Sequence, residues 1–194
     1  MSSIDLKSWH KSNIVGIGGQ GKSVLFRYLV KKYLEVGVRV ILYDSEKQYA
    51  DFTAPSLIVY SPQNPGDLDE FDKVCLTAYN MGRVLLAVES IDFYASPKMN
   101  LSPALKKIVH WGRMRGVGLL TTSRRPADVH KDICGLANNW FLFHLYIKDD
   151  IKWLKSFVGE IAESLKELPQ YEFIHWTRGK ATRHNPIPRE EAEF

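Results

Sequence analysis

Short apolar runs alternate with longer amphipathic stretches along almost the whole chain. Runs of strand length, each ended by glycine, proline or polar residues, predict strands over residues 13–19, 38–44, 56–62, 83–90, 117–123 and 139–146. The stretches between them predict helices over residues 22–37, 66–82, 100–116, 126–137, 148–159 and 160–168. We expect residues 171–184 to form a terminal hairpin around the Arg-Gly-Lys at 178–180.

Particular residues mark the ends of these helices. Gly37 stands where the cap of the helix over 22–37 belongs, and Ser102 and Pro103 are the expected N-cap and first residue of the helix over 100–116. The helix over 66–82 has acidic residues in its first turn, which favours the helix dipole.

Nearly continuous apolar strands that alternate with helices predict an α/β fold, with a mostly parallel sheet covered on both faces. The chain has no internal repeats, and its proline-containing loops are too short to link domains. We therefore expect one domain over residues 1–194, with residues 1–11 as an N-terminal extension and residues 180–194 as a C-terminal tail. The segment 56–62 is expected to be buried, like the segment 38–44.

The composition is that of an ordinary soluble protein. The 194 residues are 45% hydrophobic and 25% charged, and no segment approaches the run of about 18 apolar residues that crosses a bilayer. The first ten residues lack the layout of a secretory signal, so we expect a cytoplasmic protein with no membrane partner. Cys75 and Cys134 are expected to be small core residues, and the scattered histidines predict no structural zinc.

The formal net charge is +4, which is compatible with a nucleic-acid partner. The basic residues gather in segments 110–116, 122–126 and 176–184, and an ordinary solvated surface explains each of these clusters about as well. Residues 96–100 and 177–184 are candidate loops for contacts with DNA phosphates, which carry no sequence information.

The segment "GIGGQGKS", Gly16–Ser23, fits the phosphate-binding pattern G-x-x-x-x-G-K-[ST] between a predicted strand and a predicted helix. Its glycines allow successive backbone N–H groups to curve around a phosphate, and Lys22 would reach the β- and γ-phosphates. The Ser23 hydroxyl is the expected Mg²⁺ ligand. The expected nucleotide contacts are Gly16, Gly18, Gly19, Gln20, Gly21, Lys22, Ser23 and Val24.

A hydrolytic site of this kind needs a carboxylate near Mg²⁺ and usually one that orients the attacking water. Glu89 ends the strand 83–90 at the sheet edge where ligands bind, and it is followed by Ser90 where hydrolysing P-loop ATPases usually have Asp-Glu. We expect Glu89 to hold the metal, to polarise the water, or to do both. Asp44, Glu46 and Asp92 remain alternatives.

Three landmarks together resemble the HerA/FtsK superfamily of ring-forming DNA-translocating ATPases, particularly the small genome-packaging members of archaeal virus type. The first is "GIGGQGKS" followed by "VRVILYDSEKQY", and the second is "VLLAVESIDFY" in the place of the Asp-Glu strand. The third is "GRMRGVGLLTTSRRPADVHKDICGLANNWFLFHL". The segment "LPQYEFIHWTRG" is similar to the closing segment of these proteins, so the resemblance covers residues 12–179.

The resemblance implies a RecA/ASCE-like P-loop NTPase domain that hydrolyses ATP with Mg²⁺ to move double-stranded DNA, most plausibly into a viral capsid. It implies non-sequence-specific binding of DNA, self-association into a ring that is expected to be hexameric, and contact with a capsid or portal. The location would be the host cytoplasm or the virion. A small nucleotide-dependent kinase or transferase and a non-hydrolysing regulator remain alternatives, whereas a GTPase switch is disfavoured because no Asn-Lys-x-Asp element occurs.

The resemblance also implies an arginine that acts on the nucleotide of a neighbouring subunit. The catalytic candidates are Arg113, Arg125 and Arg124, and Arg113 and Arg125 rank first because they match family positions. Arg115 is a further candidate, and any of the four could instead face DNA or solvent. Arg124 replaces the usual sensor glutamine and is expected to stabilise charge, which leaves polar sensing to Thr121, Thr122 or Ser123. Core packing or a subunit interface is expected for Trp153, Phe157 and Trp176.

Overall fold

The computed structural model describes residues 7–194, and these residues form one eight-stranded sheet in the order β3-β2-β4-β5-β1-β6-β7-β8. Strands β1 to β6 are parallel, and the last two strands join as an antiparallel hairpin. The predicted mostly parallel α/β sheet with a C-terminal hairpin is therefore confirmed. The strands are β1 (Lys11–Val15), β2 (Arg39–Tyr43), β3 (Leu57–Tyr60), β4 (Val84–Val88), β5 (Gly118–Ser123), β6 (Asn139–Leu142), β7 (Phe173–Thr177) and β8 (Lys180–His184).

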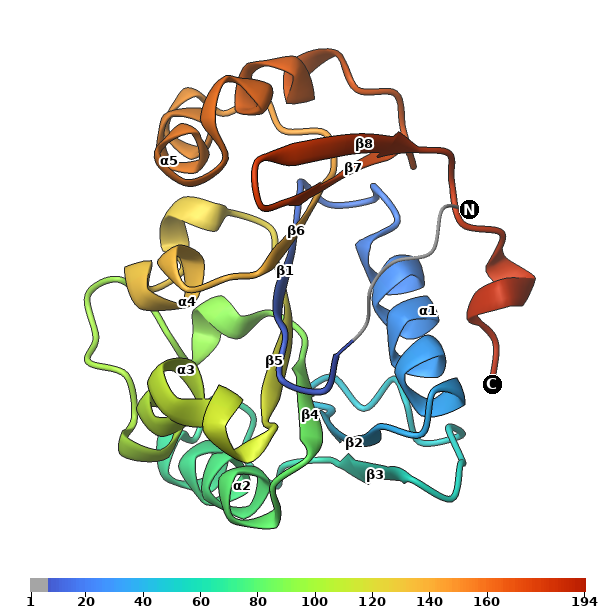
Figure 1. Cartoon of the computed structure of the whole chain (residues 1–194), viewed down its shortest axis with the longest axis vertical. Coiled ribbons are helices and arrows are strands. Elements are labelled where there is room, and N and C mark those ends of the chain that lie inside the picture. The colour runs from blue at the N-terminus through green and yellow to red at the C-terminus, as the bar shows by residue number, and fades with distance from the viewer. Residues whose placement is uncertain (1–6) are drawn as a thin grey trace.

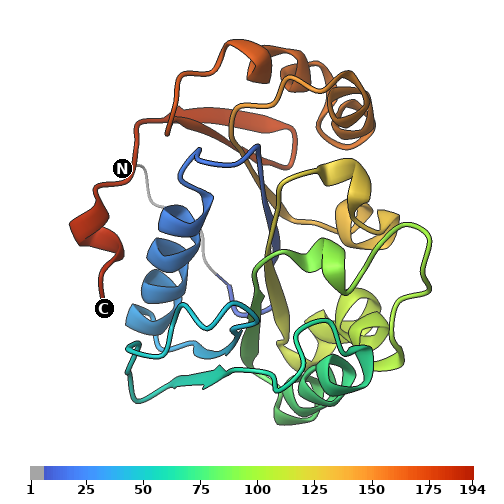
Figure 2. The same cartoon turned by 180° about the vertical axis from the view of Figure 1, so that it is seen from behind.

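Helices cover both faces of the sheet (Figure 1, Figure 2). Helix α1 lies on one face together with a short C-terminal 3-10 helix, and α2 to α5 lie on the other. The α-helices are α1 (Lys22–Glu35), α2 (Leu68–Met81), α3 (Pro103–Arg115), α4 (Lys131–Gly135) and α5 (Lys148–Val158). The 3-10 helices are Ile91–Phe93, Pro126–Asp128, Gly159–Glu167 and Arg189–Ala192.

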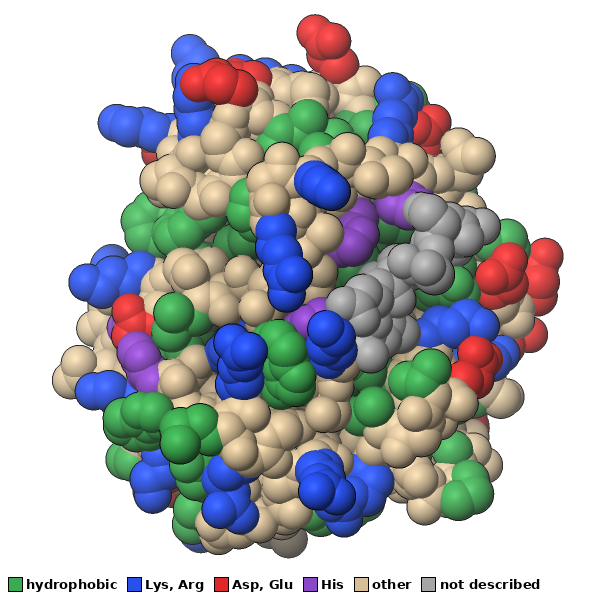
Figure 3. Space-filling model, in the orientation of Figure 1, with side chains coloured by type: hydrophobic (Ala, Val, Ile, Leu, Met, Phe, Trp, Pro, Cys, Tyr) green, Lys and Arg blue, Asp and Glu red, His purple; other side chains and the backbone are tan. Residues whose placement is uncertain are grey.

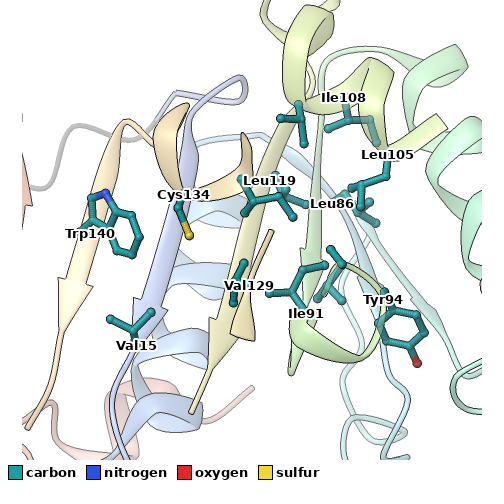
Figure 4. Packing of buried hydrophobic residues seen from close by; sticks show 14 of the residues in the cluster. Val15, Leu86, Ile91, Tyr94, Leu105, Ile108, Leu119, Val129, Cys134 and Trp140 are labelled. Carbon is teal, nitrogen blue, oxygen red and sulfur yellow. The ribbon is translucent and has the colours of Figure 1, made fainter. Parts of the chain in front are cut away.

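Each face of the sheet has its own hydrophobic core. On the α1 face, β1 contributes Ile14, which packs with Leu25, Phe26 and Phe141. On the other face, side chains from the sheet meet those of α2, α3 and α4, and Figure 4 shows Leu86, Leu105, Leu119 and Cys134 among them. Both cysteines are buried and free, as expected from the sequence.

Strand β3 departs from its prediction. The segment 56–62 was expected to be buried, but β3 lies at the edge of the sheet and pairs only with β2 within the described residues. Ile58 is 49% exposed at this edge of the described sheet. An apolar run of four residues does not distinguish an edge strand from a central one.

The helix ends explain how α2 and α3 are held together. Ser102 occupies the predicted N-cap position of α3, but its side chain makes no capping hydrogen bond. The carboxylate of Asp72 on α2 instead accepts a hydrogen bond from the N–H of Ala104, at 2.8 Å. At the other end of the pair, the Arg115 guanidinium donates to the carbonyl oxygens of Tyr79 and Asn80. The two helices are therefore joined near both ends.

Other boundaries differ from the predictions in detail. The predicted helix over 126–137 is a 3-10 turn followed by the short α4, and the predicted helix over 160–168 is a 3-10 helix. Lys11, assigned to the N-terminal extension, is the first residue of β1, whereas residues 1–6 of that extension lie outside the described residues. Gly37 has the left-handed backbone (φ +77°) that a cap requires.

The predicted tail, residues 180–194, is part of the packed structure. It begins with β8 and then crosses to α1, where Ala192 is buried. Lys31 of α1 donates to the carbonyl oxygen of Glu193 at 2.7 Å, and the rings of Phe52 and Phe194 stack with centroids 4.0 Å apart. None of the helices within residues 7–194 has the length and apolar character needed to cross a membrane.

Candidate functional site

A polar cavity of 260 Å³ lies where β1, β2, β4 and β5 end. In a parallel sheet this is the carboxyl edge, the usual place for ligands in open α/β folds. The glycine-rich loop between β1 and α1 forms one wall, and the segments after β2, β4 and β5 form the others. The lining residues are Gly18, Gly19, Gln20, Gly21, Lys22, Ser23, Val24, Glu46, Gln48, Glu89, Ser90, Thr122 and Arg124.

The glycines of the loop serve different purposes. Gly19 and Gly21 have left-handed backbones (φ +75° and +93°), which side-chain-bearing residues adopt at a cost. Gly16 does not line the cavity, and a Cβ built there would lie 2.5 Å from the Cβ of Phe143. Gly16 is therefore required for the close approach of the loop to the segment after β6.

Lys22, the first residue of α1, folds back over the loop. Its ammonium donates to the carbonyl oxygen of Ile17 at 2.8 Å. Burial, together with the positive charge of Arg124, lowers the pKa of Lys22 to about 8. Glu89 and Asp92 act against this shift. A phosphate beside Lys22 would stabilise the positive charge that burial disfavours, so this lysine is suited to an anionic ligand.

Glu89 follows the last residue of β4 and is 8% exposed. Its Oε2 accepts a hydrogen bond of 2.5 Å from the Tyr49 hydroxyl, and the Ser23 hydroxyl also donates to this carboxylate. Burial raises the pKa of Glu89, and these two donors oppose that rise. The Arg27 guanidinium lies over the Tyr49 ring, 5.1 Å from its centroid. Glu89 is thus connected to α1 directly through Ser23 and indirectly through Tyr49.

The other predicted carboxylates have different surroundings. Asp44 is 1% exposed, and its two oxygens accept the backbone N–H groups of Gln48 and Tyr49. Glu46 is exposed, lines the cavity and accepts a 2.7 Å hydrogen bond from the Gln48 side chain. Asp92 lies in the 3-10 helix after β4 and is not among the residues that line the cavity.

The end of β5 contributes two residues to the cavity, Thr122 and Arg124. The Thr122 hydroxyl accepts the N–H of Ser90 at 2.9 Å, which links the ends of β4 and β5. Thr121 instead donates to Asn13 of β1, and Ser123 bonds to the backbone of Arg125. Of the three polar residues expected to sense the nucleotide, the structure brings Thr122 to the cavity.

The remaining arginines lie away from this cavity. Arg125 reaches Asp150, a fully buried carboxylate of α5, at 3.3 Å. Arg113 is exposed at the C-terminal end of α3, with its guanidinium 4.5 Å from the centroid of the Trp9 ring. Arg115 is occupied by the two α2 carbonyl groups. Because α3 runs opposite to the strands, Arg113 and Arg115 lie at the amino end of the sheet.

A second cavity, of 390 Å³, shares Gly19, Gly21 and Val24 with the first. The additional wall is largely apolar and comes from late segments of the chain: Phe143, Tyr171, Phe173, Pro186, Ile187 and Arg189. The Gln170 side chain also donates to the Gly19 carbonyl oxygen at 3.2 Å. The sequence did not predict this cavity, although the apolar Pro186-Ile187 pair in the last segment of the chain was a usable signal.

The first cavity contains the groups needed to hold a phosphate chain and a divalent cation. A hydroxyl oxygen from Ser23 and carboxylate oxygens from Glu89 lie together beside the loop. Such hard oxygen donors suit Mg²⁺, which takes one or two protein carboxylates together with substrate phosphates. Nowhere in residues 7–194, this cavity included, do three His, Cys, Asp or Glu side chains gather in a way that could hold a metal ion by themselves.

A mostly parallel sheet whose glycine-rich loop between β1 and α1 ends in Gly-Lys-Ser is typical of the P-loop NTPase class of fold, and known structures agree. The chain is similar to B204, the DNA-packaging ATPase from Sulfolobus turreted icosahedral virus, with a TM-score of 0.83 and 21% identity over 94% of this chain and 100% of that chain. It is also similar to the genome packaging NTPase B204 from Sulfolobus turreted icosahedral virus 2 in complex with ATP-γ-S, with a TM-score of 0.81 and 20% identity over 94% and 100% of the two chains.

A third similar structure is the pCW3 conjugation coupling protein TcpA with ATP-γ-S. Its TM-score is 0.66 at 15% identity, and the match covers 93% of this chain and 61% of TcpA. No family model and no curated protein matches the sequence. At these identities the likeness establishes the fold, and it confirms the predicted P-loop NTPase architecture.

Proposed function

We propose that the protein is an ATPase that uses ATP hydrolysis to move double-stranded DNA, and that it serves as the packaging motor of a virus. One observation carries the proposal. A polar cavity with Lys22, Ser23 and Glu89 lies at the carboxyl edge of the sheet, and the fold of the chain is similar over its length to that of a DNA-packaging ATPase. The match leaves no part of B204 uncovered, whereas it covers only 61% of TcpA.

In this proposal the nucleotide lies across both cavities. The phosphates lie against the loop Gly18–Ser23, with Lys22 on the β- and γ-phosphates. Ser23 and Glu89 hold Mg²⁺, which supplies charge neutralisation when bound. Arg124 lines the same cavity and stabilises charge on the γ-phosphate. The base enters the apolar cavity beside Tyr171 and Ile187, where burial of its faces is favourable.

DNA and further copies of the chain complete the proposed machine. Figure 3 shows a face with Lys and Arg side chains spread over its middle and Asp and Glu mainly toward its rim. Such a face suits the phosphate backbone of a duplex without regard to sequence. The proposal includes a ring, expected to be hexameric, in which an arginine of one subunit reaches the nucleotide of the next. The ring would bind to a viral capsid or portal.

The test is steady-state ATP hydrolysis by the purified protein, with and without long double-stranded DNA. A duplex of about ten base pairs is the matched control, because it supplies the same phosphates without a length to travel. Long DNA should raise the turnover several-fold more than the short duplex at equal phosphate concentration. Phosphate release must require Mg²⁺ and no added acceptor, which excludes a kinase.

Tight ATP binding without hydrolysis, with and without long DNA, would refute the motor and favour a non-hydrolysing regulator. The replacement of the usual second carboxylate by Ser90 is the observation that keeps this second function in view.

A further inference from the structure

We propose that Glu46 takes the proton from the water that attacks the γ-phosphate, while Glu89 serves the magnesium ion. This inference rests on the proposed ATPase function. It assigns metal binding to the end of β4 and proton transfer to the segment after β2, whereas adjacent carboxylates usually carry both roles. Four carboxylates lie near the phosphate loop. The inference rests on finding the one that lines the cavity and is not needed to hold the surrounding backbone in place.

Glu89 is the most constrained of these carboxylates. It is 8% exposed, it accepts a short hydrogen bond from Tyr49, and it accepts another from Ser23. The Ser23 hydroxyl is the expected metal ligand, so its hydrogen-bond partner lies where the metal shell must form. A carboxylate held from two sides is well placed to orient a cation and its waters. Such a carboxylate is poorly placed to accept a proton from the attacking water.

The residue after Glu89 cannot supply a second carboxylate. Ser90 has a left-handed backbone (φ 52°), and its N–H is bonded to the Thr122 hydroxyl. A serine hydroxyl does not act as a base near neutral pH without a partner that accepts its own proton. The function of the missing acid must therefore come from another segment.

Two of the remaining carboxylates are excluded, Asp44 by its contacts and Asp92 by its position. Asp44 is buried, and each of its oxygens accepts a backbone N–H of the turn that follows β2. Its task is to fix that turn. Asp92 lies in the 3-10 helix after β4, outside the lining of the cavity.

Glu46 has the required placement. It is exposed, lines the cavity together with Gln48, and accepts a 2.7 Å hydrogen bond from the Gln48 amide. Lys47 between them has a left-handed backbone (φ 55°), in a turn that Asp44 fixes. The same turn therefore presents a carboxylate that accepts a proton and an amide that can hold both this carboxylate and a water.

The reaction balances with these groups. The water oxygen forms a bond to the γ-phosphorus as the bond from that phosphorus to the β–γ bridging oxygen breaks. The electron pair of the broken bond stays on ADP. One proton of the water passes to the Glu46 carboxylate, which later releases it to the phosphate product or to solvent.

The experiment compares four carboxyl-to-amide variants of the full chain: Glu46→Gln, Glu89→Gln, Asp92→Asn and Asp51→Asn. Asp51 is the matched control, because it is an exposed carboxylate a few positions after Glu46 in the sequence and does not line the cavity. Each variant is assayed for DNA-stimulated ATP hydrolysis and for binding of a fluorescent ATP analogue with and without Mg²⁺. The binding assay separates loss of chemistry from loss of the site.

We expect Glu46→Gln to reduce kcat by about 10²–10³-fold, in the range of a lost general base, with analogue affinity within about threefold of wild type. Glu89→Gln should weaken the Mg²⁺-dependent part of binding, and Asp51→Asn should behave as wild type. Glu46→Gln turnover within about fivefold of wild type would overturn the assignment. So would a loss of turnover in Asp92→Asn with Mg²⁺-dependent binding intact.

The wild-type assay distinguishes this inference from the proposed function. Wild-type protein that binds ATP and never hydrolyses it overturns both. An active wild type with an equally active Glu46→Gln variant overturns the Glu46 assignment alone.

Discussion

Charged side chains line a cavity at the carboxyl end of the parallel sheet, whereas at the amino end they are exposed or bound to backbone carbonyl groups. At the carboxyl end, Lys22, Glu46 and Arg124 line one cavity. At the amino end, Arg115 is tied to backbone carbonyl groups and Arg113 lies exposed on the Trp9 ring. Since a helix runs back against the strand that follows it, an arginine that ends a helix is separated from its own chain's nucleotide by the length of the sheet. Arg113 is therefore too far from the cavity of its own chain to act there, and in the proposed ring it would act on the nucleotide of a neighbouring subunit.

The sharpest way to test the carboxyl end is to remove its lysine. Lys22→Ala should lower ATP turnover by at least about 10³-fold, because the β- and γ-phosphates lose their principal cation in a partly buried cavity. Circular dichroism should show an intact fold. Lys73→Ala, an exposed change on α2, is the control. If the Lys22→Ala protein still hydrolyses ATP, the assignment of this loop as the phosphate-binding site is wrong.

The amino end is tested by mixing subunits. Arg113→Ala should reduce the turnover of the assembled protein by about 10²–10³-fold, since an arginine supplied to a neighbour's γ-phosphate is worth that much or more. Mixing Arg113→Ala with Lys22→Ala should restore part of the activity, because some interfaces then combine an intact lysine with an intact arginine. Mixtures that are no more active than their components would rule out action between subunits.

Acid should destabilise the amino end. The β7 residue His175 is bonded to Asn139, the first residue of β6, and burial lowers its pKa to about 4. An unfolded histidine has a pKa near 6.5, so the stabilising difference is complete above that value and is lost as pH falls from 6.5 toward 4. With allowance for partial solvent screening, we expect a loss of about 1 kcal/mol between pH 7 and pH 5.

Urea midpoints at the two pH values measure this loss. The His175→Gln variant, which retains a donor for Asn139, should lose less stability on acidification than wild type. An equal pH dependence in both proteins would assign the effect to other groups.

The smallest expected effect separates structure from chemistry at the amino end. Arg115→Ala should lower the free energy of unfolding by about 0.5–1 kcal/mol, because two exposed, charge-assisted hydrogen bonds to the end of α2 are lost. Turnover of the folded protein should stay within about twofold of wild type. A large loss of turnover at unchanged stability would show that Arg115 takes part in the reaction.

The sequence predicts most of the fold because the apolar periods and the glycine-rich motif are local signals. The order of the strands and the edge position of β3 are decided by pairings between distant segments, so Ile58 could not be recognised as exposed. The same limit applies to the site. Glu46 and Asp44 are two residues apart in one turn, yet only contacts reveal that Asp44 holds the turn and that Glu46 faces the cavity.

Other parts of the site depend on contacts over long sequence separations. The Tyr49–Glu89 hydrogen bond joins residues 40 positions apart, and the apolar cavity combines the phosphate loop with Tyr171 and Ile187. No residue spacing within one segment encodes such a meeting. What the sequence does offer is the resemblance, which places the phosphate loop and the strand of Glu89 in one site before any contact is known.

The joints between α2 and α3 have a mechanical consequence. Asp72 of α2 binds the start of α3, and Arg115 of α3 binds the end of α2. Hydrogen bonds near both ends therefore oppose sliding of one helix along the other. Helix α3 leads directly into β5, and α2 into β4. A load applied where Arg113 is exposed would pass along this stiff pair to the strands that carry Glu89 and Thr122 at their far ends. In the proposed ring, strain at one subunit interface would thus change the positions of Glu89 and Thr122.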